Sequence, residues 1–235
     1  MARPQPLILL PPSEAKSEGG RGGPWGPGLA ADGALDAARQ QVLRAAAGSG
    51  ALDPRGPTRP AIERYTGVLY RELAWATLPA VARRRGAASV RIASGLWGLV
   101  APVDPIPHYK LKMSARLGGL GRLSTWWRPH LAPVVAARVD GAVVWDLLPN
   151  EHAAAMDWKV AAPARRVTVR FVDGQDRTVS HWNKLLKGAL VRWILTAEPV
   201  GPEDLAGFDH PLGYRYDPRA STLDGPLAAT VLRQR

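Results

Sequence analysis

Residues 90–113 read VRIASGLWGLVAPVDPIPHYKLKM, and this stretch decides how the rest of the chain is interpreted. The β-forming residues from Val90 onward predict a short strand, which Ser94 and Gly95 end. Three prolines between 102 and 107 then exclude a regular helix or a central strand, because proline has a fixed φ and no backbone N–H. We therefore expect a fixed, extended loop in which Asp104 is held among the prolines.

The residues after the prolines alternate between two kinds of side chain, with Tyr109, Leu111 and Met113 in one set and His108, Lys110 and Lys112 in the other. A period of two places the first set on one side, facing a core, and the second set on the other. A stiff loop with a carboxylate, followed by a phenol and two ammonium groups, is typical of a functional site. A proline-rich connector with an exposed basic edge fits these residues equally well.

Bulk composition limits the class of protein. The 235 residues are 46% hydrophobic and contain no cysteine, which excludes disulfides and thiolate metal sites. No apolar run approaches the roughly 20 residues of a membrane helix, and the N-terminal run is too short for a signal peptide. We expect one domain, residues 1–235, in the cytoplasm, with no membrane partner and no cofactor.

Positive charge is concentrated in two windows of the chain, which has a formal net charge of +11. Residues 105–130 hold five basic residues and no acid, and residues 159–192 hold eight basic residues against two acids. The remaining chain is neutral, with 18 residues of each sign. If the windows meet in the fold, they form one surface that attracts the phosphates of nucleic acid or nucleotide. Compositional bias towards arginine is the alternative, but scattered arginines would not leave the rest neutral.

Two buried strands are predicted to deliver polar side chains where they end. Residues 7–10 form one strand, and Lys16 follows it as a candidate phosphate or carboxylate anchor, or as an ordinary exposed lysine. Residues 143–148 form the other, and Asn150 and Glu151 follow it. Glu151 and His152 cannot act as a catalytic pair alone, because adjacent residues do not point together.

Ser180 is a good N-cap, and the clearest helix in the sequence starts there. Its apolar face is predicted to contain Trp182, Leu185, Leu186, Ala189, Trp193 and Ile194. Lys184, Lys187 and Gly188 lie opposite, one turn apart, where a phosphate or a backbone could come close. A solvated helix face explains the two lysines as well, and on physical grounds alone it is favoured.

With the remaining patterns, the sequence predicts a mixed α/β (α+β) fold in which helices flank a central mixed sheet. Helices are expected at 35–47, 61–65, 68–75, 78–85 and from Trp126 to about 139, and strands at 167–172, 213–217 and 229–232, with residues 177–179 returning beside 167–172 as a hairpin. Arg83–Arg85 are expected to end their helix, favoured by its dipole. Five histidines without ligand spacing predict no metal site.

Read in order, the segments resemble the YaaA family of peroxide stress proteins. The resemblance rests on LLPPSEAK (9–16), YTGVLY (65–70), SGLWGLVAPVDPIPHYKLKM (94–113), Trp127, DLLPNE (146–151), VSHWNKLLKG (179–188) and GYRYD (213–217). It implies the family's own mixed α/β fold with a basic cleft, and an association with survival under hydrogen peroxide, lowered intracellular iron and binding to double-stranded DNA. The family motif positions fall on Lys16, Ser94, Asp104, Tyr109, Lys110, Trp127, Asn150, Glu151, Ser180, Lys184 and Lys187.

This chain also departs from the family pattern. Lys112 stands where an acid is usual, His152 where tyrosine is usual, and Lys187 where arginine is usual. The region before Tyr65 is short and broken by prolines, so the helical segment suited to DNA is reduced. The reduction of this segment weakens the implication of DNA binding.

Two functions follow as hypotheses. The first is a stress protein that binds double-stranded DNA through a basic cleft, mainly at backbone phosphates. The second is an enzyme acting on a small phosphorylated or nucleobase-containing substrate, because a phosphate-binding surface alone needs no carboxylate, phenol or amide. In that case Glu151 is the acid/base, Lys16 and Lys184 hold the anion, and Tyr109 orients the substrate.

Overall fold

The computed structural model describes residues 4–53, 55–178 and 180–234. Its strands are β1 (Leu7–Leu10), β2 (Arg59–Pro60), β3 (Val90–Ser94), β4 (Gly98–Val100), β5 (Pro105–Ile106), β6 (Arg116–Leu117), β7 (Gly121–Arg122), β8 (Val143–Asp146), β9 (Arg165–Val172), β10 (Tyr214–Tyr216) and β11 (Leu227–Gln234). Its α-helices are α1 (Asp36–Ala46), α2 (Ala61–Arg64), α3 (Val68–Leu73), α4 (Ala80–Ser89), α5 (Leu123–Ala136), α6 (Asn150–Ala153), α7 (Trp158–Ala161) and α8 (Ser180–Ala197).

A mixed sheet forms the centre of the fold. Within the described ranges it has seven strands in the order β10-β11-β9-β8-β1-β3-β4. The five inner strands are parallel, and the strands at the two edges, β10 and β4, are antiparallel to their neighbours. The strand β1 pairs with β3 on one side and with β8 on the other. Chain order therefore reverses at β1, where open α/β sheets place their ligand sites.

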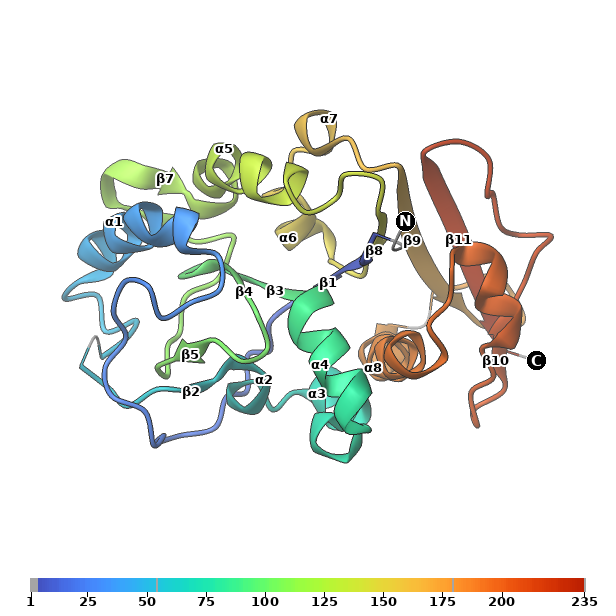
Figure 1. Ribbon diagram of the computed structural model, residues 1–235, viewed down its shortest axis with the longest axis horizontal. Coiled ribbons are helices and arrows are strands. Elements are labelled where there is room, and N and C mark those ends of the chain that lie inside the picture. Colours follow the sequence, from blue (N-terminus) through green and yellow to red (C-terminus); the bar gives the residue numbers. More distant parts are fainter. Residues whose placement is uncertain (1–3, 54, 179, 235) are drawn as a thin grey trace.

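Helices cover both faces of the sheet (Figure 1). α1, α5, α6 and α7 lie on one side of β1, β3 and β8, and α3, α4 and α8 lie on the other. Parallel strands need this arrangement because each crossover places its helix against a face of the sheet. The predicted class, a mixed α/β protein with a central mixed sheet flanked by helices, is confirmed.

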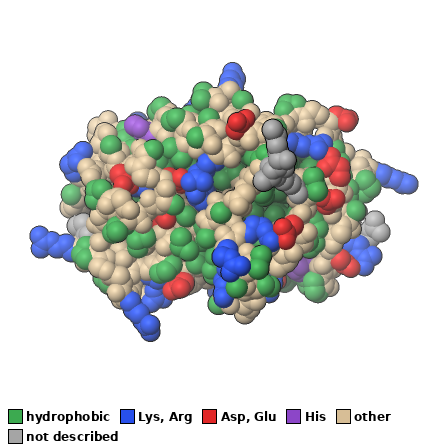
Figure 2. Space-filling model, in the orientation of Figure 1, with side chains coloured by type: hydrophobic (Ala, Val, Ile, Leu, Met, Phe, Trp, Pro, Cys, Tyr) green, Lys and Arg blue, Asp and Glu red, His purple; other side chains and the backbone are tan. Residues whose placement is uncertain are grey.

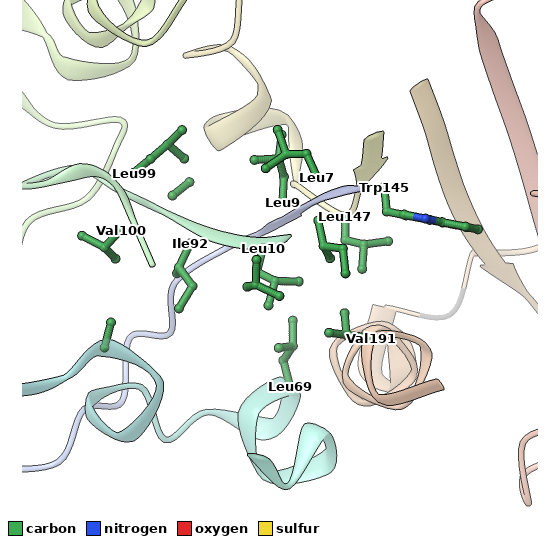
Figure 3. Close-up of a cluster of buried hydrophobic side chains, with 14 of the residues drawn as sticks. Leu7, Leu9, Leu10, Leu69, Ile92, Leu99, Val100, Trp145, Leu147 and Val191 are labelled. Atoms are coloured by element: carbon green, nitrogen blue, oxygen red, sulfur yellow. The ribbon is translucent and has the colours of Figure 1, made fainter. Parts of the chain in front are cut away.

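The strand β1 consists of four consecutive apolar residues because it is covered by the core on both faces of the sheet. Leu7 to Leu10 are all at most 2% exposed, as expected for a strand covered on both faces. Figure 3 shows Leu7 and Leu9 on one side of the sheet and Leu10 on the other, towards Leu69 of α3 and Val191 of α8. Burying a side chain of this size contributes about 1.5–3 kcal/mol, so β1 anchors both layers.

Helix α8 packs on α3 at a glycine. A side chain at Gly188 would overlap the carbonyl oxygen of Leu69 and come within 2.9 Å of Glu72 Cβ. The space at Gly188 therefore admits the α3 backbone, which is the second of the two uses predicted for it.

Several expectations need correction. The α4 helix continues past the three arginines to Ser89, so they do not end it. Trp182 is 39% exposed, whereas Leu186 and Ile194 of the predicted face are buried, and Leu190, Val191 and Leu195 complete the buried stripe of α8. The segment after β9 does turn back beside it as predicted, through the antiparallel bridge of Val172 with Thr178 and the hydrogen bond from the Asp173 N–H to the Arg177 carbonyl, while the ladder partners of β9 are the parallel strands β8 and β11. Val179 of the expected hairpin lies outside the described residues.

None of the helices in the described ranges has the length and apolar character needed to cross a membrane.

Candidate functional site

Polar side chains lie at the carboxyl-terminal ends of three neighbouring parallel strands. We call this end of the sheet, where the strands finish, the carboxyl edge. Lys16 follows β1, Ser94 is the last residue of β3, and Asn150 and Glu151 follow β8. Because β1 lies between β3 and β8, their carboxyl ends are adjacent. The predicted delivery of polar groups by strand ends is therefore found in the structure.

Three buried hydroxyl groups form a hydrogen-bonded chain at this edge, which we call the hydroxyl chain. The Oη of Tyr109 lies 2.7 Å from Ser94 Oγ and 2.6 Å from Tyr65 Oη. Ser94 Oγ also accepts the backbone N–H groups of Leu96 at 3.2 Å and Trp97 at 3.1 Å. The hydroxyl-bearing residues are at most 2% exposed.

The amine of Lys16 lies over the aromatic rings of the two tyrosines in the hydroxyl chain. Its Nζ is 4.5 Å from the centre of the Tyr109 ring and 5.7 Å from that of Tyr65, within reach of a cation–π interaction. It donates to the carbonyl of Ser13 at 2.9 Å, with a longer contact of 3.5 Å to the carbonyl of Glu14. The backbone of Lys16 bridges to that of Tyr65, which fixes the two residues side by side.

Burial separates the proton affinities of these groups. The pKa of Lys16 is lowered to about 8, mainly by burial; Glu14 opposes this shift, and the charges of Arg64 and Lys110 add to it. Burial raises the pKa of Tyr109 to about 12, and burial followed by its neighbour Tyr109 raises the pKa of Tyr65 well above 10. Both phenols therefore stay protonated donors at neutral pH, while the amine titrates close to it.

Three exposed lysines surround this cluster, and we call Lys110, Lys112 and Lys184 the rim lysines. Lys112 Nζ lies 2.9 Å from Glu14 Oε1. The pKa of Glu14 is lowered first by Lys112 and then by the charges of Lys184 and Lys16. Lys110 in turn acts on Lys16. Lysines from separate parts of the sequence thus meet around residues 14–16.

Glu151 lies beside the rim lysines. Its Oε1 accepts the backbone N–H of Ser114 at 2.9 Å. Burial alone would raise the pKa of Glu151, but the hydrogen bonds from Ser114 and the charges of His152 and Lys112 outweigh burial and lower it. The carboxylate is therefore ionised at neutral pH. The neighbouring Asn150 is exposed at the start of α6.

Lys187 lies deeper than predicted, since α8 turns it towards the sheet. Its Nζ donates to the carbonyl of Leu147, just after β8, at 2.7 Å. Burial lowers the pKa of Lys187, and Asp146 partly opposes this effect. Lys184 alone of the two lysines lies on the exposed face of the helix. Ser180 begins α8, but its side chain lies outside the described part of the structure.

Two predicted residues build the frame of the site. Asp104 is buried and accepts the backbone N–H groups of Ala31 at 2.9 Å and Ala101 at 2.8 Å. Trp127 is fully buried and its indole N–H donates to the carbonyl of Gly95 at 2.8 Å. Both side chains therefore fix the backbone of the loop around residues 94–104 through hydrogen bonds.

Close backbone packing explains Gly95. A side chain there would come within 2.7 Å of the Lys112 carbonyl carbon and 2.8 Å of the Leu111 oxygen. The segment that carries Tyr109 and the rim lysines can therefore lie directly against the end of β3. The alternation predicted from the sequence holds, because Tyr109 and Met113 are buried while Lys110 and Lys112 are exposed.

Most arginines of the second basic window serve other purposes. Arg166 binds Asp146, with Nε and a terminal nitrogen at 2.9 and 2.7 Å from Oδ2. Arg165 pairs with Glu203 and Arg177 with Asp173. Arg192 donates to carbonyls of the α3 end. The two windows therefore meet through their lysines, while these arginines join the sheet and helices together.

The distribution of lysine is the clearest signal that sequence reasoning missed. The chain has six lysines, the other 25 of its 31 basic residues being arginine. Five of the six belong to the carboxyl edge, namely Lys16, Lys110, Lys112, Lys184 and Lys187, and we call them the edge lysines. The exception, Lys159, is on α7, before the amino end of β9. Tyr65 was also missed as a site residue, since its position in YTGVLY gives no sign of its partner Tyr109.

Other features lie away from this edge. One hollow of about 340 Å³ is lined by Asp217, Pro218, Arg219 and Arg233. In the part of the chain that the structure describes, no group of three or more His, Asp or Glu side chains could hold a metal ion.

The fold and the site define a class of protein with an open, mainly parallel α/β sheet and a lysine- and tyrosine-lined cluster at the point where strand order reverses. Residues 33–220 match the family model described as peroxide stress protein YaaA, and the chain belongs to this family. It is 38% identical to a UPF0246 protein of Streptomyces coelicolor, over 96% of this chain and 98% of that protein. It is 34% identical to a UPF0246 protein of Corynebacterium glutamicum (82% and 86% covered) and 32% identical to one of Roseobacter denitrificans (72% and 69%).

Proposed function

We propose that this peroxide stress family member binds the phosphates of double-stranded DNA through its rim lysines, as part of a response to oxidative stress. The supporting observation is that Lys110, Lys112 and Lys184 come from separate segments, are exposed, and lie around residues 14–16. Exposed ammonium groups bind backbone phosphates as point charges and give affinity without sequence preference.

The proposed contact is small, and its size sets the salt dependence. Each neutralised phosphate contributes about 0.9 to the slope of log K against log salt, so three lysines give a slope of about −3. Glu14 and Glu151 lie among the lysines and limit the positive field. On the face seen in Figure 2, Lys and Arg side chains are scattered, with acidic groups beside several of them. Both features favour weak, strongly salt-dependent binding.

Fluorescence anisotropy of a labelled 20-base-pair duplex between 25 and 200 mM salt tests this proposal. The variant Lys110→Gln/Lys184→Gln should bind more weakly at low salt, with the slope reduced by about two. Arg84→Gln is the matched control, because Arg84 is exposed on α4, which leads into the amino end of β3. The proposal would be contradicted if the control and the rim variant lost duplex affinity equally, or if the wild-type protein did not bind the duplex at 25 mM salt.

A second candidate is an enzyme that acts on a small phosphorylated or nucleobase-containing molecule at the same edge. The observation that favours it is the Lys16 amine, whose pKa is about 8 and which lies over the ring of Tyr109, the central member of the buried hydroxyl chain. Shifted pKa values cluster where proton transfer is needed. Lys16 and Lys184 would hold the anion, ionised Glu151 would act as the base, and Tyr109 would orient the substrate through its hydrogen-bonded neighbours.

Turnover of a panel of nucleoside phosphates tests this candidate. Glu151→Gln should abolish turnover while leaving substrate binding within a few-fold of wild type, since the amide keeps the shape of the carboxylate. Turnover that survives in Glu151→Gln would remove Glu151 from the role of base.

A further inference from the structure

The amine of Lys16 is partly buried and has few partners. Its Nζ donates to the Ser13 carbonyl at 2.9 Å and makes a longer contact of 3.5 Å with the Glu14 carbonyl. Among the described residues no carboxylate lies within ion-pair distance of this Nζ, and the carboxylate of Glu14 pairs with Lys112 at 2.9 Å. An ammonium group has three N–H donors and is costly to bury without acceptors. The geometry therefore favours the neutral amine, which has a free lone pair.

The groups packed around this amine favour the same form. The Nζ of Lys16 lies 4.5 Å from the centre of the Tyr109 ring, so an aromatic ring replaces water on that side. Burial is the main cause of the lowered pKa of Lys16, about 8, which Glu14 opposes and to which the charges of Arg64 and Lys110 add. At pH 7 about one tenth of the amine is then neutral, against roughly one part in 2,500 for an ordinary lysine. Desolvation beside other cationic groups is what makes a lysine nucleophilic.

The position of Lys16 suits a substrate that carries a phosphate. Lys16 is partly exposed, and its backbone bridge to Tyr65 fixes where the side chain begins. The exposed rim lysines surround it, because Lys110 acts on Lys16 and because Lys16 and Lys184 both act on Glu14. An anionic group held by the rim lysines therefore lies next to the amine.

We propose that Lys16 forms an imine with the carbonyl carbon of a small phosphorylated aldehyde or ketone, whose phosphate group is held by the rim lysines. This inference rests on the second, small-molecule candidate and deepens it. It names the reacting group of the substrate, and it gives Lys16 a covalent role in place of a contact with the anion. A carbonyl compound suits the site because amines bond to it covalently, and a phosphate suits it because the rim lysines are exposed point charges.

The bond-forming step balances without any further reactant. The neutral amine of Lys16 adds its lone pair to the carbonyl carbon, and the electron pair of the C=O π bond moves to the oxygen. One amine proton passes to that oxygen, which gives a carbinolamine. The nitrogen lone pair then expels the hydroxyl group, which leaves with the second amine proton as water. One amine and one carbonyl group thus become one imine and one water molecule.

Lys187 is the other edge lysine whose amine is partly buried, and its surroundings differ. Burial lowers the pKa of Lys187 as well, but the charge of Asp146 opposes this shift. Its Nζ donates to the Leu147 carbonyl at 2.7 Å, on the side of α8 that faces the sheet. Lys16, which lies among the rim lysines, is therefore the amine that a phosphorylated substrate reaches.

Competition among the six lysines of the wild-type chain tests the proposal. The protein is incubated at pH 7 with glyceraldehyde 3-phosphate or with unphosphorylated glyceraldehyde, imines are trapped by reduction with cyanoborohydride, and the modified lysines are identified by peptide mass spectrometry. Either aldehyde should modify Lys16 roughly tenfold faster than the exposed Lys159, because the larger neutral fraction outweighs the lower nucleophilicity of a less basic group, as in thiols. The phosphate should speed the reaction at Lys16 further, and Lys184→Gln should reduce the ratio of the two rates.

The outcomes separate the reactive amine from the phosphate contact. Modification of Lys16 no faster than that of Lys159, or a first adduct on Lys187, overturns the inference independently of the second candidate. Equal rates of the two aldehydes at Lys16 would overturn the phosphate contact, and the second candidate with it, while the reactive amine would stand. Lys16→Arg keeps the positive charge and should lose the first adduct, and an unchanged adduct pattern in this variant would also overturn the inference. Near-ultraviolet circular dichroism checks the fold of each variant, and the competition in the wild-type chain needs no variant.

Discussion

The hydroxyl chain predicts that two apparently similar substitutions have unequal effects on stability. Tyr109→Phe and Tyr65→Phe each remove one buried hydroxyl and keep the aromatic ring. The Tyr109 hydroxyl lies within hydrogen-bond distance of both other groups, 2.6 Å from Tyr65 Oη and 2.7 Å from Ser94 Oγ. Tyr65→Phe removes the 2.6 Å hydrogen bond and leaves the one between Tyr109 and Ser94 in place.

Tyr109→Phe should have the larger effect, because it removes the central hydroxyl. Both the 2.7 Å hydrogen bond with Ser94 and the 2.6 Å hydrogen bond with Tyr65 are lost. A hydrogen bond contributes about 0.5–1.5 kcal/mol, and a buried polar group left without a partner costs about 1–3 kcal/mol. We therefore expect Tyr109→Phe to lower the free energy of unfolding by about 1–3 kcal/mol, and Tyr65→Phe to lower it by about 1 kcal/mol.

Urea unfolding of both variants, followed by tryptophan fluorescence, measures this difference. Equal m-values would show that the two variants differ in stability and not in the compactness of the unfolded state. The reasoning is refuted if Tyr65→Phe is as destabilising as Tyr109→Phe, since the central hydroxyl would then contribute no more to stability than its neighbour.

Three other predictions concern the frame and the charge of the site. Lys16→Met should be more stable than wild type at pH 7, with the difference shrinking from about pH 8 to 10.5, because the folded state binds the Lys16 proton less tightly than the unfolded state; a difference that is constant with pH, measured by urea unfolding, would contradict this. Gly188→Ala should lower stability by about 1–3 kcal/mol by forcing α8 away from the Leu69 carbonyl, whereas Gly174→Ala, in open space, should change the melting temperature little. Asp104→Asn should cost about 1–3 kcal/mol, since one of the two backbone N–H groups that donate to the buried Asp104 carboxylate loses its acceptor; an unchanged denaturation midpoint would show that Asp104 does not hold the loop.

Local patterns were sufficient to predict most of the elements. Leu7–Leu10 was predicted as a strand from its run of four apolar residues, and the strand from Val90 was predicted from its β-forming residues, which Ser94 and Gly95 end; both strands are fully buried in the structure. The helix from Ser180 was predicted with its full length because its amphipathic period is sustained over 18 residues. These signals depend on neighbours in sequence, which is the information that a sequence contains directly.

Contacts between distant segments were harder to predict. The sequence places Tyr65 and Tyr109 44 residues apart, and nothing local indicates that their hydroxyl groups meet. Trp182 was predicted on the apolar face of α8 and Lys187 on the opposite face, but Trp182 is exposed and Lys187 turns towards the sheet. Helical periodicity identifies the faces of a helix but not which neighbouring element covers each face. Charge counting located the two basic windows but did not separate lysines at the carboxyl edge from arginines such as Arg166, which pairs with Asp146.

Selective labelling of lysine gives the most direct test of the claim that the carboxyl edge is the anion-binding site. The chain has six lysines, so the NMR spectrum should contain six side-chain signals. Addition of a short DNA duplex at 25 mM salt should shift the signals of the rim lysines most, with Lys159 unchanged. A shift of Lys159 equal to that of the rim lysines, or no shift of any edge lysine, would contradict the account.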